Sequence, residues 1–227
     1  MKSINNYISE KLVINRNIKL NYNYNYFPKT KDELLDIIEQ RIEEEGNECD
    51  LNDIDVSEIA DMSTLFYDSN FNGDISKWDV RNVKDMRHMF VYSYFNGDIS
   101  NWNVSKVEDM SAMFMSSKFN QDISDWNVSN VKFMTNMFYG SKFNQDISKW
   151  DVHNVTQMTN MFEKSKFNQD ISNWDVSKVE NMWAMFENSK FNQDISKWKI
   201  NNKCSINDIF YNSPLQGKEK EWWGRTK

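Results

Sequence analysis

Carboxylate and amide side chains recur at fixed spacing in this chain, and their oxygen atoms could bind a row of cations. An aspartate recurs every 24 residues, and an asparagine stands two positions before each one. The aspartates are Asp74, Asp98, Asp122, Asp146, Asp170 and Asp194, and the asparagines are Asn72, Asn96, Asn120, Asn144, Asn168 and Asn192. Oxygen ligands suit Ca²⁺, but the sequence lacks the glycine-rich nonapeptide turn of calcium-binding β-rolls. Hydrogen bonding to backbone N–H groups in turns is the favoured interpretation, so we expect no metal and no cofactor.

Catalytic chemistry has little support in the sequence. The two histidines, His88 and His153, stand at different positions of the repeat and nearly three repeats apart. We find no Cys/His pair, Ser/His/Asp set, phosphate-binding loop or metal-ligand spacing. We therefore expect a protein that is not an enzyme and has no catalytic residues.

The element that positions these side chains is a 24-residue unit close to F-N-Q-D-I-S-x-W-x-V-S-x-V-x-x-M-x-x-M-F-x-x-S-K. Copies start at Phe71, Phe95, Phe119, Phe143, Phe167 and Phe191, with no insertion between them. A degenerate copy over residues 47–70 precedes them. Self-similarity at such a period predicts a solenoid. A stack of near-identical coils has no unique interior pocket, so the sequence favours binding along a surface over catalysis at a point.

Two local patterns alternate within each copy. Apolar residues from Val83 to Phe90 have the i, i+3, i+6, i+7 spacing of a short helix, and the segment Asp74–Val80 has the composition of a strand. The sequence therefore predicts an α/β repeat solenoid of the leucine-rich-repeat kind, with about seven 24-residue coils that each contain a short strand and a short helix.

Capping segments are expected at both ends, because a solenoid exposes an apolar face at each terminus. Residues 1–46 are predicted to form an N-terminal tag and cap with a short helix, a strand and a helix over 31–45, which Thr30 begins as part of a capping box. The repeat solenoid is predicted over 47–214. Residues 215–227 are predicted to form a C-terminal cap.

The repeat unit resembles the BspA-like bacterial surface-protein repeat of about 25 residues, a leucine-rich-repeat relative. The resemblance covers roughly residues 50–214 and is based on Trp, Met and Phe at fixed offsets. It implies a right-handed, leucine-rich-repeat-like solenoid and a surface protein that acts in adhesion or protein–protein contact. Catalytic residues are not part of that pattern.

The chain departs from that family in its N-terminal sequence. Residues 1–13 lack an apolar core and a cleavage site, no lipobox cysteine or wall anchor is visible, and no stretch is long enough to span a membrane. We therefore expect a cytoplasmic or virion-associated chain rather than one secreted by the standard route. The opening M-K-S-x-x-x-Y-I-x-E-K-L is similar to N-terminal tags of some bacteriophage virion proteins, so a structural or packaged component of a phage or other assembly is an alternative function.

A protein partner is the expected ligand, and a glycan is a further alternative. The net charge of −7 argues against nucleic acid, because phosphate binding needs clustered Lys and Arg. The recurring Trp residues from Trp78 to Trp198 could be imagined as a row that stacks on sugars. Because one occurs in every full copy among apolar residues, we expect them in the core, together with the Met and Phe columns.

The informative positions are those at which the copies differ. Framework positions are constant, so the varying ones are expected to face solvent. Aromatic residues at such positions have no structural need, and exposed aromatic residues are enriched at binding sites. Neutral drift of surface residues is the alternative explanation. The candidate binding surface comprises Phe133, Tyr139, Trp183, Val91, Met115, Arg87 and Tyr211.

Overall fold

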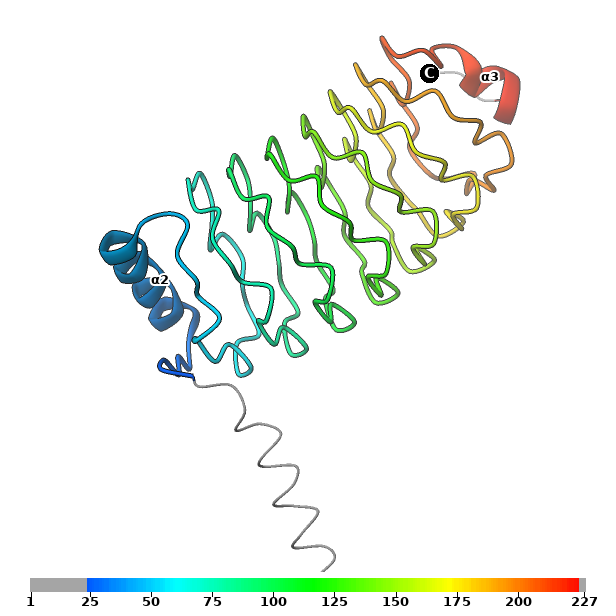
Figure 1. Ribbon diagram of the computed structural model, residues 1–227. Coiled ribbons are helices and arrows are strands. Elements are labelled where there is room, and N and C mark those ends of the chain that lie inside the picture. The colour runs from blue at the N-terminus through cyan, green and yellow to red at the C-terminus, as the bar shows by residue number, and fades with distance from the viewer. Residues whose placement is uncertain (1–23, 225–227) are drawn as a thin grey trace, which may run out of the picture.

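The computed structural model describes residues 24–224 as a stack of coils that lies between two helices (Figure 1). Helix α2, Lys31–Glu45, lies at the N-terminal end of the stack, and helix α3, Lys218–Trp223, lies at the other end. Between them, backbone bridges join residues 24 positions apart. The part of the chain described has no other helix and no strand beyond isolated parallel bridges. The prediction of an α/β, leucine-rich-repeat-like solenoid with a strand and a helix in each coil is therefore wrong.

Helix α2 begins where the capping box predicts. The Thr30 side chain accepts a hydrogen bond from the backbone N–H of Glu33 at 3.2 Å, which satisfies one of the free N–H groups of the first turn. Leu34 and Ile38 on one face are fully buried against the first coil. Arg41 donates to the carboxylate of Asp53 at 2.8 Å, so the helix also has a polar attachment to the stack.

The interior consists of columns in which one residue type stacks on its copy in the next coil. The rings of Phe114 and Phe138 lie nearly parallel with their centroids 5.7 Å apart. Each repeated Trp side chain is 3–4% exposed, and its indole N–H donates to a backbone carbonyl of the preceding coil, as Trp102 does to Ile75 at 3.1 Å. Burying one such side chain contributes about 1.5–3 kcal/mol. The prediction that the Trp, Met and Phe columns form the core is confirmed.

The predicted short helix is replaced by consecutive tight turns. Met89, Val91 and Ser93 each donate a backbone hydrogen bond to the carbonyl three residues earlier, at 3.3, 3.3 and 3.2 Å. His88 and Tyr92 have φ angles of 58° and 57°, which lie in the left-handed region. The same two positions have positive φ in the neighbouring coils. A residue with positive φ at every fourth position cannot belong to a right-handed helix.

The predicted strand over Asp74–Val80 is also replaced by turns. The carboxylate of Asp74 accepts the backbone N–H of Ser76 at 2.8 Å, and the N–H of Trp78 donates to the carbonyl of Ile75 at 3.2 Å. These N–H groups are therefore not available to a neighbouring coil. Local side-chain hydrogen bonds of this kind compete with a ladder.

The C-terminal end of the stack is covered by aromatic side chains. The rings of Trp222 and Trp223 lie 6.0 and 5.8 Å from the ring of Phe210 in the last coil. The helix predicted near the N-terminus lies outside the residues that the structure describes, as does most of the predicted strand before Pro28. Neither α2 nor α3 has the length and apolar character that crossing a membrane requires.

Candidate binding surface

One stretch of each coil forms a regular backbone ladder with the preceding coil. In the coil that starts at Phe71, four alternate carbonyls accept N–H groups from the coil before it. The pairs are Asp85 with Met62 (2.9 Å), Arg87 with Thr64 (3.0 Å), Met89 with Phe66 (2.9 Å) and Val91 with Asp68 (2.7 Å). We call residues 85–91 and their equivalents in the other coils the outer ladder.

Two positions of the outer ladder carry side chains that change between coils in both charge and size. They correspond to residues 85 and 87, whereas the equivalents of Met86, Met89 and Phe90 are buried in the core. The first column comprises Asp61, Asp85, Asp109, Phe133, Gln157, Asn181 and Ser205, and parallel bridges join all of its members. The second comprises Ser63, Arg87, Ser111, Thr135, Thr159, Trp183 and Asn207. The backbone at these positions is fixed by stacking, whereas the side chains vary in charge and size.

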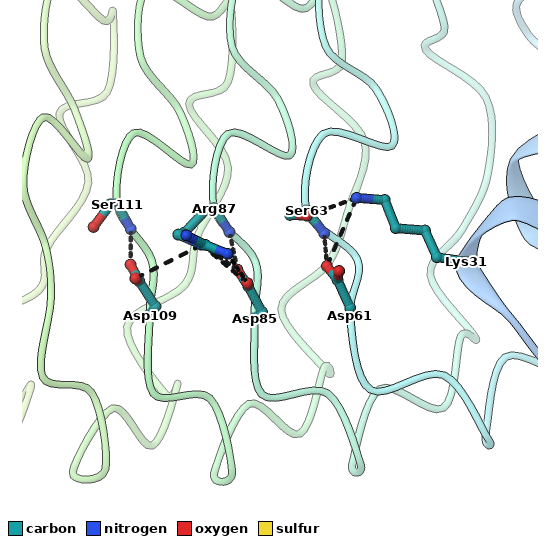
Figure 2. Close-up of polar contacts among 7 residues, drawn as sticks. All are labelled: Lys31, Asp61, Ser63, Asp85, Arg87, Asp109 and Ser111. Carbon is teal, nitrogen blue, oxygen red and sulfur yellow. Dashed lines mark hydrogen bonds and ion pairs between the residues drawn. The ribbon is translucent and has the colours of Figure 1, made fainter.

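The N-terminal part of the outer ladder carries three carboxylates on successive coils (Figure 2). Asp61, Asp85 and Asp109 each accept the backbone N–H two residues further on, at 2.7, 3.0 and 2.8 Å. Lys31 reaches this row from α2. Its ammonium group donates to the hydroxyl of Ser63 at 2.6 Å and lies 3.8 Å from the carboxylate of Asp61.

Arg87 partly neutralises the same row. Its guanidinium lies 2.6 Å from an oxygen of Asp85 and 3.8 Å from one of Asp109 (Figure 2). Desolvation raises the pKa of Asp85, but hydrogen bonds from Arg87 outweigh it, so the net pKa is lowered. Within residues 24–224 no group of three or more His, Cys, Asp or Glu residues is arranged to bind a metal. The carboxylates at this end of the outer ladder are therefore largely neutralised by the side chains of Lys31 and Arg87.

In the C-terminal part of the outer ladder, from Phe133 onward, the two columns are uncharged and carry exposed aromatic residues. Phe133 is 39% exposed and Trp183 is 42% exposed. They lie two coils apart, about 10 Å at the usual spacing of stacked backbones. The side chain of Asn181 accepts the backbone N–H of Trp183 at 2.9 Å, which fixes the local turn. Phe133 and Trp183 thus flank a strip of amide and hydroxyl side chains.

The structure places all seven predicted residues on the outer ladder, but at different depths. Arg87 and Tyr211 are exposed like Phe133 and Trp183, whereas Met115 and Tyr139 are half-buried. Val91 is only 2% exposed, so the expectation that it faces solvent is wrong. Glu163 occupies the same position of another coil and is 7% exposed. At this position Val91 and Glu163 are therefore buried, whereas Tyr211 in the last coil is 48% exposed.

Sequence reasoning missed a second group of exposed aromatic residues. Tyr67, Tyr92 and Tyr94 are 50%, 46% and 56% exposed. The rings of Tyr67 and Tyr92 meet edge to face with their centroids 6.1 Å apart. The ammonium of Lys118 lies 5.4 Å from the ring of Tyr94. The signal for Tyr94 was present in the sequence, because the next four coils have Lys at this position.

The aspartate column that first suggested cations has a structural role. Each carboxylate accepts the backbone N–H of the serine two residues later, as Asp146 does from Ser148 at 2.8 Å. This hydrogen bond lowers the pKa of Asp122, Asp146, Asp170 and Asp194. The interpretation of the column as local hydrogen bonding in turns is therefore confirmed. The histidines lie apart, with His153 hydrogen-bonded to Asp151 at 2.7 Å and His88 on the outer ladder.

Comparison with known proteins identifies a family without an assigned function. A family model described as "Mycoplasma protein of unknown function, DUF285" matches residues 38–142 and again residues 116–223. The two matches overlap and together include most of the coils. No curated protein matches the chain. No solved structure matches it either.

Proposed function

We propose that this chain, which belongs to the DUF285 family of repeat proteins, is a non-enzymatic module that binds a protein partner. The proposed contact surface is the uncharged part of the two columns of the outer ladder, between Phe133 and Trp183. The observation that carries the proposal is that both side chains are about two-fifths exposed on a backbone that stacking holds in place.

Neither Phe133 nor Trp183 belongs to the buried core. The core positions on either side of them, such as Met134 and Met182, are fully buried and complete the stacking without them. An exposed Trp or Phe is the kind of residue that contributes most to protein interfaces when a partner covers it. The amide and hydroxyl groups between them can form hydrogen bonds without the desolvation penalty of charged groups.

Where this interaction takes place, at a cell surface or in a larger assembly, is also part of the proposal. Resemblance to the BspA-like repeat supports a surface protein that acts in adhesion. The alternative role in a phage or other assembly depends on residues 1–16, which lie outside the residues described.

The test is affinity capture with matched surface variants of the full chain. Wild type, the double variant Phe133→Ser/Trp183→Ser and the control Phe27→Ser are immobilised and exposed to extract from the native source. Phe27 is a suitable control because it is 56% exposed and lies outside the outer ladder. A specific protein partner should be captured by wild type and Phe27→Ser and lost by the double variant. If the double variant captures the same proteins in the same amounts, this surface is not the binding site.

A further inference from the structure

Four lysines form a single row along the edge of the stack, separate from the surface between Phe133 and Trp183. They are Lys118, Lys142, Lys166 and Lys190, and all four are exposed. Their backbones are stacked in register. For example, Lys118 donates its backbone N–H to Ser93 of the preceding coil at 3.0 Å, and Lys190 donates to Ser165 at 3.3 Å. At about 4.8 Å per coil, the row is about 14 Å long.

The ammonium groups of the lysine row have no carboxylate partner among residues 24–224. Some other surface lysines have a carboxylate partner, as Lys132 has in Glu108 at 2.7 Å and Lys164 has in Glu163 at 2.9 Å, whereas others, such as Lys149, have none within the described part of the chain. What distinguishes the lysine row is that it places such lysines on four successive coils. Adjacent like charges at this spacing repel each other by somewhat less than about 1 kcal/mol in water. The lysine row is therefore a local region of positive charge on a chain whose net charge is −7.

Carboxylates stand on both sides of the lysine row in the sequence, and they limit the shape of a ligand that could bind there. Three positions before the lysines, the coils carry Glu163 and Glu187, and four positions after them the aspartate column begins. A flat anionic surface or a wide duplex that covers the row would also approach these carboxylates. A single flexible polymer chain that lies along the stack axis avoids them.

The aromatic end of the row indicates the chemical class of this polymer. Tyr94 occupies the lysine position in the coil before Lys118, is 56% exposed, and has the Lys118 ammonium 5.4 Å from its ring. Non-specific binding of single-stranded nucleic acid needs an aromatic ring for successive bases, whereas this column offers one ring at its end. We propose that the lysine row binds an acidic glycan chain, sulfated or rich in uronate, and that the Tyr94 ring packs against one of its sugars.

The test measures binding of a fluorescent heparin hexasaccharide to the full chain by fluorescence polarisation. The row variant replaces the four lysines with Gln. The control variant replaces Lys77, Lys149, Lys197 and Lys199 with Gln, which changes the net charge equally. Three of these control lysines already lie near carboxylates of the aspartate column. We expect the row variant to weaken binding by about tenfold or more, because four exposed ion pairs are lost together, and the control by less than about threefold. Tyr94→Ala should weaken it by about threefold.

Several outcomes would overturn the proposal. One is failure of wild type to bind the hexasaccharide. Another is equal weakening of binding by the row and control variants, which would indicate a net-charge effect. Tighter binding of a single-stranded oligonucleotide or of vesicles with anionic lipid, at the same ionic strength, would show that the polyanion is of another class. Thermal unfolding of both variants should match wild type, because all the replaced side chains are exposed.

Discussion

The core columns and the outer ladder repeat with the same 24-residue period, but only the core columns keep their side chains. In the core, Trp and Phe are retained because each stacks on its copy and the Trp indole also hydrogen-bonds to the coil before it. On the outer ladder the backbone makes the inter-coil hydrogen bonds, so the side chains at the two outward positions can change. The comparison teaches that the core columns are constant because their side chains form the stacking contacts, whereas the two outward positions of the outer ladder can vary because the backbone alone forms the contacts there.

The largest expected effect comes from a core column. Phe138 is fully buried, and its ring stacks on Phe143 at 4.3 Å and on Phe162 at 5.6 Å. Phe138→Ala should lower the free energy of unfolding by about 3–5 kcal/mol, the usual cost of such a cavity. Chemical denaturation measures this change. A loss below about 1 kcal/mol would mean that the column does not hold the coils together.

A smaller effect is expected from the backbone of the turns at the end of the outer ladder. Gly140 has a φ of 61°, and a Cβ added there would lie 3.0 Å from the hydroxyl oxygen of Ser116. Gly140→Ala should cost about 1–2 kcal/mol, because the left-handed conformation is strained for L-residues other than glycine. Asn136→Gly, at a φ of 57°, is the matched control and should change stability by less than about 0.5 kcal/mol. Equal losses for the two variants in thermal unfolding would argue against the turn geometry.

The smallest expected effect concerns side chains that are constant and yet exposed. The pKa of Asp146 lies below its ordinary value of 3.8, because its carboxylate accepts the N–H of Ser148. A lowered pKa in the folded state contributes stability above the unfolded pKa, and this contribution is lost as pH falls through the folded value. Asp146→Asn keeps the acceptor and does not titrate, so its melting temperature should fall less than that of wild type between about pH 5 and about pH 2. If the melting temperatures of wild type and Asp146→Asn fall equally with pH, titration of this carboxylate does not contribute to stability.

The stacking could be predicted from the sequence, but the conformation within each coil could not. Columns of Trp, Met and Phe indicated the core because burial depends on residue type and spacing. The same Met and Phe spacing fits both a helix and a run of turns that point apolar residues inward. The signal for turns was at the positive-φ positions, where Asn160, Gly140 and Asn188 are typical of left-handed backbone. His88 and Tyr92 occupy the same two positions in another coil and obscure it.

Part of the candidate site could also be predicted from the sequence. Phe133 and Trp183 stood out because their types break the repeat, and both are exposed. Val91 also breaks the repeat, but it is buried, whereas Tyr211 at the same position of another coil is exposed. Variation of residue type therefore does not by itself indicate exposure. Tyr94 was not predicted, although the change from Lys to Tyr at this position of the repeat is visible in the sequence.

The most direct test compares two tryptophans of the same coil, one from each region. Trp174 is 4% exposed and its indole N–H donates to Ile147 at 3.1 Å, whereas Trp183 is 42% exposed on the outer ladder. Chemical denaturation should show that Trp174→Ala loses about 3–5 kcal/mol and that Trp183→Ala stays within about 0.5 kcal/mol of wild type. Similar losses for both variants would contradict the account, because the outer aromatic residues would then belong to the scaffold.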